Sequence, residues 1–132
     1  MAKKITAIRS YLPEIKRMQT LQTQHLVEGM SRSSSLNEGT IRFVVYELRD
    51  AILKAHRTGQ AAKIEGLGTF TPTIRLDGSL DVLFRPDPDM LRQLNDRGKF
   101  YAKILNKANI RKTADELVAQ WNKEHPDDPV EE

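Results

Sequence analysis

The side chains that most often perform catalysis are few and far apart in this chain. The 132 residues include no cysteine, and the three histidines lie 31 and 69 positions apart, too far to form a sequence motif for a metal. The serines at positions 33–35 have no nearby base and no nucleophile elbow. We therefore predict that the protein is not an enzyme, binds no metal and uses no cofactor. The histidines, His25, His56 and His125, are expected to be surface or edge residues.

The side chains that remain available for chemistry are basic. Between positions 97 and 112 the chain has six Lys or Arg residues and no acid, with Phe100 and Tyr101 among them. Basic residues mixed with aromatics are typical of nucleic-acid contacts. The alternative is a solvated linker whose aromatic rings pack on the domain. The six basic residues are Arg97, Lys99, Lys103, Lys107, Arg111 and Lys112.

The net charge of +3 hides an uneven distribution. Residues 1–70 carry 11 basic and 6 acidic side chains, whereas residues 71–132 carry 10 basic and 12 acidic ones. Residues 124–132 hold five acids and no base, so a disordered acidic tail is predicted there. No apolar run is long enough for a membrane span or a signal peptide, so we expect no membrane partner and a cytoplasmic location.

Two helices are expected to position the first half of the chain. Apolar residues at helical spacing predict a short helix over residues 22–32. A capping box at Ser35–Glu38 predicts the start of a long helix, and Gly59 predicts its end. The long helix has so broad an apolar face that it suits burial against more than one neighbour, such as a dimer partner.

After Gly59 the apolar period changes to two, which predicts a three-stranded antiparallel meander over residues 61–85. Asp77-Gly78 favours a tight two-residue hairpin turn. Phe70 and Phe84 are available to anchor the core, and Pro72 requires an edge or bulge position.

Shorter elements flank this core. Asp87-Pro88 predicts the start of a short helix that ends at Gly98, and a second capping box at Thr113–Glu116 predicts a helix over 114–124. Trp121 on that helix is expected to dock either on the domain or on a partner. Residues 4–11 suit an extended segment, and residues 15–21 fit either a strand or a helix.

The amino-acid sequence of the predicted meander resembles that of one known family. The stretch GQAAKIEGLGTFTPTIRL, with its turn Gly66-Leu67-Gly68-Thr69-Phe70, is similar to the signature of the bacterial histone-like HU and integration host factor (IHF) family. The return strand Val82-Leu83-Phe84-Arg85-Pro86 resembles the family's junction into its last helix. The resemblance covers about residues 20–96.

This resemblance implies an intertwined dimer, cytoplasmic and nucleoid-associated, whose β-ribbon arms bend double-stranded DNA by wedging a proline between base steps. The chain departs from the pattern because Arg75-Leu76-Asp77-Gly78-Ser79 closes the ribbon with no arm and no wedge proline. Two acids, Asp87 and Asp89, stand where the family often has a lysine. Extensions at both ends are also absent from short HU proteins, so the chain looks like an armless HU-related variant.

We therefore predict an α+β, HU/IHF-like fold with two N-terminal helices, the meander with a short hairpin, a short helix after it and an extra helix near the C-terminus. The expected divisions are an extension with an added strand over 1–19, the core over 20–96, a basic linker and helix over 97–123, and the tail over 124–132.

Two functions remain open. The first is binding of double-stranded DNA without sequence specificity, by a homodimer that contacts the phosphate backbone without intercalation. The second is an HU-fold module for dimerisation and protein interaction that has lost DNA binding. The residues predicted to contact DNA are Lys63, Arg75, Arg85, Arg97, Lys99, Lys103, Lys107, Arg111 and Lys112.

Overall fold

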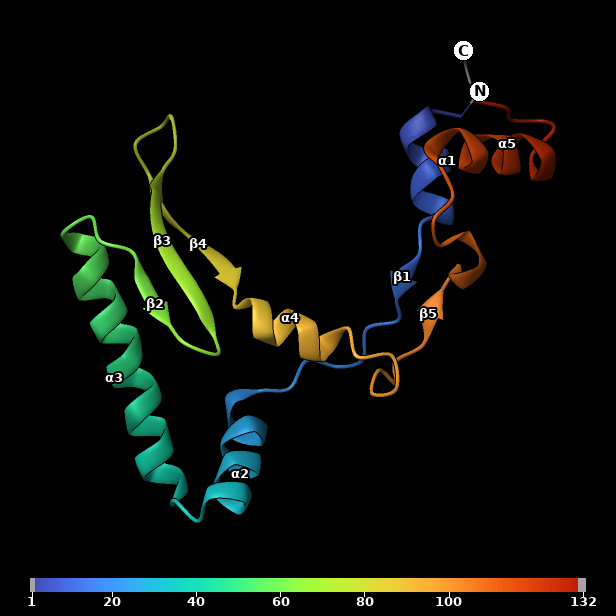
Figure 1. The fold of residues 1–132 in the computed structure, drawn as a ribbon. Coiled ribbons are helices and arrows are strands. Elements are labelled where there is room, and N and C mark those ends of the chain that lie inside the picture. Colours follow the sequence, from blue (N-terminus) through green and yellow to red (C-terminus); the bar gives the residue numbers. More distant parts are fainter. Residues whose placement is uncertain (1, 131–132) are drawn as a thin grey trace. The chain divides into compact units, whose positions relative to one another are not determined.

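The computed structural model describes residues 2–130, which form a mixture of helices and antiparallel strands (Figure 1). The chain divides into two compact units. Residues 19–100 make the central unit, close to the range expected for the HU-like core. The terminal unit combines the two ends of the chain, residues 2–18 and 101–130. No helix in the described part of the chain is long and apolar enough to cross a bilayer.

The central unit begins with two helices, α2 (Thr23–Ser34) and α3 (Glu38–Arg57), which pack against each other. Val27 of α2 and Ile41 of α3 are buried, 1% and 4% exposed. The two helices confirm the expected pair, but the predicted capping box at Ser35 is wrong. Ser35 has a left-handed φ of 63° and caps the end of α2, while the side chain of Asn37 accepts the Thr40 N–H at 2.7 Å and starts α3.

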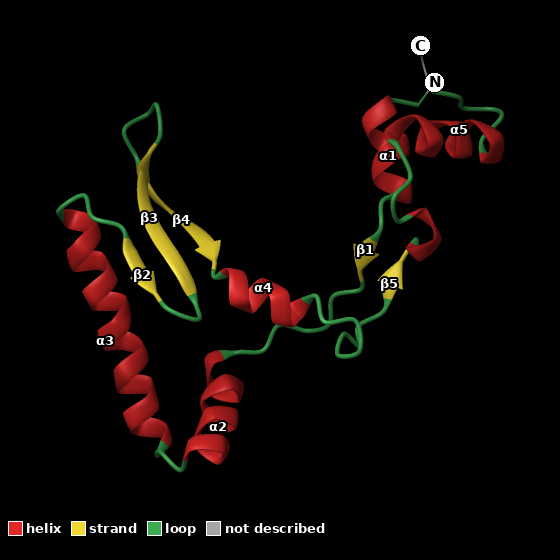
Figure 2. Ribbon diagram, viewed as in Figure 1, coloured by secondary structure: helices red, strands yellow, loops and turns green. Residues whose placement is uncertain are grey.

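The three-stranded meander is confirmed, in the order β2-β3-β4 (Figure 2). The strands are β2 (Ala62–Ile64), β3 (Gly68–Ile74) and β4 (Leu80–Pro86). Phe70 and Phe84 are cross-strand partners with ring centroids 4.8 Å apart. Pairing with β2 ends at Phe70, so Pro72 has β4 on one side and no strand on the other, which is the edge position that proline requires.

The turn between β3 and β4 is one residue longer than predicted. Arg75 N–H donates to the Ser79 carbonyl at 2.9 Å, and Gly78 N–H donates to the Arg75 carbonyl at 3.0 Å. Gly78 has a φ of 88°. This is a three-residue loop with a left-handed glycine, in which Asp77 accepts from the backbone and hydroxyl of Ser79.

The helix after the meander, α4 (Pro88–Leu94), begins as predicted, because Asp87 accepts the Asp89 N–H at 2.8 Å and proline occupies the first turn. It ends at Leu94 with Asn95 as its cap, rather than at Gly98. The Asn95 side chain donates to the Leu91 carbonyl at 2.7 Å and closes the last turn earlier.

The terminal unit joins segments that lie far apart in the sequence. Helix α1 (Lys4–Tyr11) packs on α5 (Ala114–Glu124), and the short strand β1 (Glu14–Ile15) pairs with β5 (Ile104–Leu105), followed by the 3₁₀ turn η1 (Lys107–Asn109). The predicted extended segment at 4–11 is therefore wrong. Ala7 and Tyr11 lie one helical turn apart and are buried, and that spacing favours a helix once α5 supplies a surface.

The acidic end of the chain is ordered up to Val130, so the expectation of disorder over 124–132 is wrong for 124–130. Ala2 N–H donates to the Pro129 carbonyl at 3.0 Å, and Val130 N–H donates to the Asn122 side chain at 2.8 Å. Val130 joins Ala2 and Ala7 in a small core that Val118 and Trp121 extend. Residues 131 and 132 lie outside the described part.

Gly68 generates a prediction about stability, because its φ of 155° and close surroundings leave no room for a side chain. A Cβ there would lie 2.4 Å from the Arg85 carbonyl oxygen and 2.6 Å from the Phe84 ring. Gly68→Ala should lower the stability by about 2 kcal/mol and Tm by roughly 8 °C, measured by circular dichroism at fixed protein concentration.

The matched control is Gly29→Ala within α2, where a Cβ meets no atom within 4 Å. It should leave Tm unchanged or raise it slightly, since alanine favours helix. Equal Tm values for the two variants would contradict the close packing at Gly68.

Candidate nucleic-acid interface

One face of the central sheet is mostly polar and carries two of the predicted phosphate contacts. It also includes the exposed Leu83, opposite Thr71, and the acid Asp81, opposite Thr73. Lys63 of β2 is paired with Thr69 of β3, which is paired in turn with Arg85 of β4. Because paired residues point to the same side of a sheet, these three side chains form one row across the strands. Thr71 and Thr73 continue the same face along β3. Lys63 and Arg85 are both exposed, so the row offers two cations and a hydroxyl to an anion.

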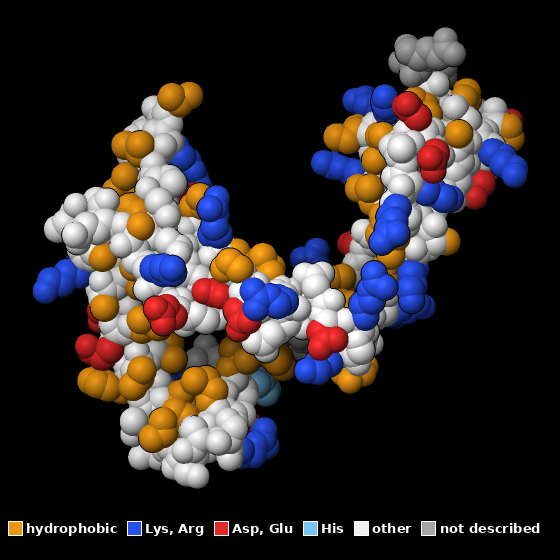
Figure 3. All heavy atoms as spheres, viewed as in Figure 1, with side chains coloured by type: hydrophobic (Ala, Val, Ile, Leu, Met, Phe, Trp, Pro, Cys, Tyr) orange, Lys and Arg blue, Asp and Glu red, His pale blue; other side chains and the backbone are white. Residues whose placement is uncertain are grey.

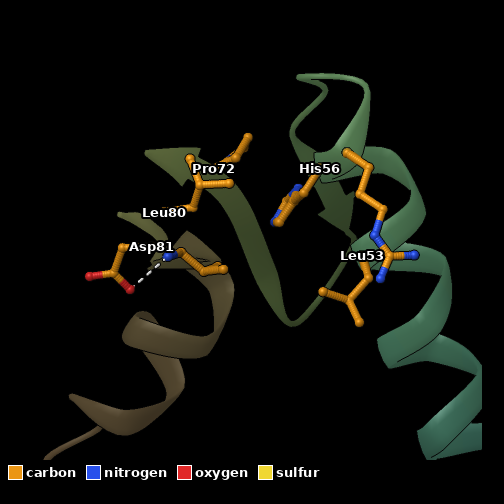
Figure 4. Close-up of a pocket in the computed structure, with 7 residues that line it drawn as sticks. Leu53, His56, Pro72, Leu80 and Asp81 are labelled. Carbon is orange, nitrogen blue, oxygen red and sulfur yellow. Dashed lines mark hydrogen bonds between the residues drawn. The ribbon is translucent and has the colours of Figure 1, made fainter. Parts of the chain in front are cut away.

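The opposite face of the sheet is apolar and lies toward α3. Pro72, Leu80 and Val82 from the sheet and Leu53 from α3 line a cavity of about 330 Å³ (Figure 4). His56, Arg57 and Asp81 complete its lining. The cavity is lined mainly by apolar side chains. Because α3 lies on this side of the sheet, the face with Lys63 and Arg85 is the one left exposed.

Arg75, a third predicted contact, is engaged within the hairpin. Its guanidinium lies 2.5 Å from the carboxylate of Asp81. The pKa of Asp81 is lowered by the Val82 backbone N–H, drawn as the dashed line in Figure 4, and further by Arg75. Asp81 therefore stays ionised and offsets the charge of Arg75, whereas Lys63 and Arg85 form no ion pair with another described residue.

The basic run at 97–112 is divided between the two units. Arg97 and Lys99 belong to the central unit, where Lys99 lies 3.6 Å from Asp96. The other four basic residues, Lys103, Lys107, Arg111 and Lys112, belong to the terminal unit and are exposed. Phe100 is half-buried, whereas Tyr101 is 87% exposed. The run is therefore not one continuous element, and its two aromatic rings have different surroundings.

Two kinds of residue on these surfaces were not predicted from the sequence. The first is the series Thr69, Thr71 and Thr73, whose alternate spacing was visible in the sequence. The second is the pair Lys16 and Arg17, which precede no recognisable motif. Lys16 N–H donates to the Lys103 carbonyl at 2.8 Å, so the two ends of the chain bring these basic residues together. Only the pairing of β1 with β5 reveals that neighbourhood.

The terminal unit is held by a polar and aromatic cluster around Tyr11. The Tyr11 hydroxyl donates to the carboxylate of Glu124, and the Tyr11 ring meets Trp121 edge to face, with centroids 6.2 Å apart. Trp121 donates to the Asp128 carbonyl at 2.7 Å, so it docks within its own chain. Asn109, which is buried, donates to the Tyr11 carbonyl at 2.8 Å.

The three histidines have structural surroundings. His25 accepts from the Gln22 N–H at the start of α2, and His125 stacks on Trp121 at 3.8 Å. Nδ1 of His56 lies 2.9 Å from the Gln60 carbonyl, while its buried Nε2 has no partner among the described residues. Residues 2–130 contain no group of three or more His, Cys, Asp or Glu side chains that could hold a metal ion.

A helix pair, a three-stranded meander with one polar face and a short helix after it define an HU-like domain, the class of the histone-like DNA-binding proteins. The chain belongs to the HU-HIG family, described as an HU domain fused to a wHTH, Ig or glycine-rich motif, and the family profile matches residues 3–82. No curated protein matches the sequence.

The hydrogen bond between Tyr11 and Glu124 generates a prediction about pH. Acceptance by Glu124 is the main cause that raises the pKa of Tyr11 from 10.0 to about 12, and the same bond lowers the pKa of Glu124. The bond thus contributes stability below pH 10, and this contribution is lost as the pH rises toward about 12. At the acid end, its contribution is lost as the pH falls below the ordinary range of Glu124.

A spectrophotometric titration of tyrosine checks this expectation. The wild-type chain should contain one tyrosine that ionises near pH 12, and Tyr11→Phe should remove that transition. Tyr46→Phe is the control and should retain it. An alkaline transition that survives in Tyr11→Phe would refute the assignment.

Proposed function

We propose that the protein binds double-stranded DNA without sequence specificity, through the polar face of the central sheet. The observation that carries the proposal is the row of Lys63, Thr69 and Arg85 across three strands. Lysine, arginine and threonine side chains are ordinary partners of phosphate oxygens, and contacts of this kind carry no base information. Membership in the HU-HIG family supports the same function.

The short hairpin limits how the DNA is held. The loop from Arg75 to Ser79 contains no proline and returns directly to β4. A family member that wraps DNA needs a long ribbon to reach around the duplex. We therefore infer a shallow contact with the backbone and no proline-wedged kink.

The two acids near α4 favoured the alternative of a protein-interaction module, but both have structural partners. Asp87 accepts from the backbone N–H groups of Asp89 and Gly66. Asp89 lies 3.1 Å from Arg92. Both acids therefore have structural roles and are not by themselves evidence for a protein interface, so DNA binding is the function supported better.

Removal of the cations of the sheet row tests the proposal. Lys63→Ala/Arg85→Ala should weaken binding to a short duplex at least several-fold and reduce the slope of log Kobs against log salt by about 2 for each subunit that contacts the duplex, since each phosphate contact contributes roughly 0.9. The measurement is fluorescence anisotropy at several salt concentrations.

The matched control is Arg32→Ala/Lys54→Ala, which removes two charges from α2 and α3. It should leave the salt slope close to that of the wild type. If the wild-type protein binds no duplex at low salt, the DNA proposal is wrong and the protein-interaction module takes its place.

We also propose that the protein is a homodimer joined through its helices. Val44, Val45 and Leu48 lie on the same stripe of α3 as the buried Ile41, yet each is more than a third exposed. Leu26 and Met30 of α2 are also exposed. A contiguous apolar surface of this kind marks an interface, and a second copy offers an identical surface.

A charge on that stripe should separate the copies. Sedimentation of the wild type should give about 30 kDa, twice the chain mass of 15.1 kDa. Leu48→Glu should raise the dimer dissociation constant by more than tenfold, because an unpaired carboxylate would enter the interface. Met18→Glu, at an exposed position outside the central unit, is the control and should remain dimeric. A wild type that sediments as a monomer would contradict the dimer.

A further inference from the structure

The two-stranded ladder of the terminal unit places basic residues opposite each other. Glu14 pairs with Leu105 and Ile15 with Ile104, and the hydrogen bond from Lys16 to Lys103 extends the same register by one residue. Lys16 and Lys103 therefore face each other across the ladder. We call the four basic residues that flank the two strands, Lys16, Arg17, Lys103 and Lys107, the ladder patch; all four are exposed. Glu14 lies two residues from Lys16 and shares its face of the ladder.

Charge within the terminal unit is strongly segregated. Residues 2–18 and 101–112 carry nine Lys or Arg and a single acid, Glu14. Residues 113–130, which include α5, carry one lysine and five acids. The described part of the terminal unit has a net charge of +4, or +2 with Glu131 and Glu132 included, against +1 for the central unit. Figure 3 shows Lys and Arg side chains gathered over β1 and β5.

Five basic side chains elsewhere in the described chain have an acidic partner, and none of the ladder patch has one among the described residues. Ion pairs within residues 2–130 are Lys4–Asp115, Arg49–Asp50, Arg75–Asp81, Arg92–Asp89 and Lys99–Asp96. Like charges opposite each other destabilise a ladder, and this ladder has only two residue pairs in its strands. A row of anions laid over the patch would reverse that repulsion.

We propose that the ladder patch is a second nucleic-acid contact, which binds backbone phosphates independently of the sheet face. The proposal rests on the proposed function, since it adds a second surface for the same ligand. Exposed Tyr101 lies two residues from Lys103 and adds a ring that can pack against a sugar or a base. Where one duplex reaches both contacts, binding of the first raises the local concentration of the second.

The ladder patch is not a property that the family match assigns. The profile ends at residue 82, whereas β5 and the nearby Lys103 and Lys107 lie beyond that position. The patch therefore exists only because the matched N-terminal segment pairs with an unmatched C-terminal one.

Salt-dependent titration of the full chain with a short DNA duplex tests the inference. Lys16→Gln/Lys103→Gln should weaken binding several-fold and lower the salt slope by about 2. The control, Lys4→Gln/Lys123→Gln, makes the same change in charge on α1 and α5 of the same unit and should keep the wild-type slope. In ¹H–¹⁵N spectra of the wild-type protein, the duplex should shift the amide signals of Lys16 and Lys103.

The two proposals fail in different ways. An unchanged slope for the ladder variant, with unshifted Lys16 and Lys103 amides, overturns the ladder contact and leaves the sheet contact standing. A reduced slope for the ladder variant, together with an unchanged slope for the sheet variant, supports the ladder contact and overturns the sheet contact. Circular dichroism of each variant verifies that the fold persists. No duplex binding by the folded wild type overturns both.

Discussion

Most of the large apolar side chains on the helices and strands of the central unit are exposed. Val27 and Ile41 are buried where α2 meets α3, but the stripe around them continues into exposed Val44, Val45 and Leu48. Burial of apolar area is the main favourable contribution that offsets the entropy lost when a chain becomes ordered. A unit of this size buries little apolar area beyond what its stability needs. The helix pair therefore requires a further surface. In the proposed dimer, a second copy would supply one without an additional element and would double every cation that the sheet presents.

The need to bury apolar side chains also explains why the two faces of the sheet differ. The apolar face of β3 and β4 lies toward α3, so the polar face with Lys63, Thr69 and Arg85 is left to the solvent. Gly68 permits the close crossing at the start of β3, where the backbone of Arg85 and the ring of Phe84 leave no space for a Cβ. Gly68 is thus needed for β3 to pair closely with β4, and this pairing positions both the Phe70–Phe84 pair and the basic row.

Local patterns predicted the central unit well, because its elements depend on nearby residues. Helix periodicity, the Asp87-Pro88 start and the meander of alternating residues were all readable, and the structure agrees with each. Failures occurred where two local signals competed or where the partner was remote. Ser35 and Asn37 are both good caps, and only the backbone shows that Ser35 ends one helix while Asn37 begins the next. Residues 4–11 are helical because α5, more than a hundred positions away, covers Ala7 and Tyr11.

The candidate site was predictable to the same extent. Lys63 and Arg85 were identified from the sequence, and strand register places them in one row. Arg75 was also predicted to contact DNA, but its guanidinium forms an ion pair with Asp81. The spacing of residues in a sequence does not distinguish a paired arginine from an unpaired one. From the sequence, the positive charge was assigned to the first half of the chain and to the run at 97–112. In the structure, most of the excess positive charge lies in the terminal unit, where the two ends of the chain meet. Since charge is counted along the sequence but acts through space, a modest net charge of +3 is compatible with a group of basic residues that flank the β1–β5 ladder in the same unit as the acidic helix α5.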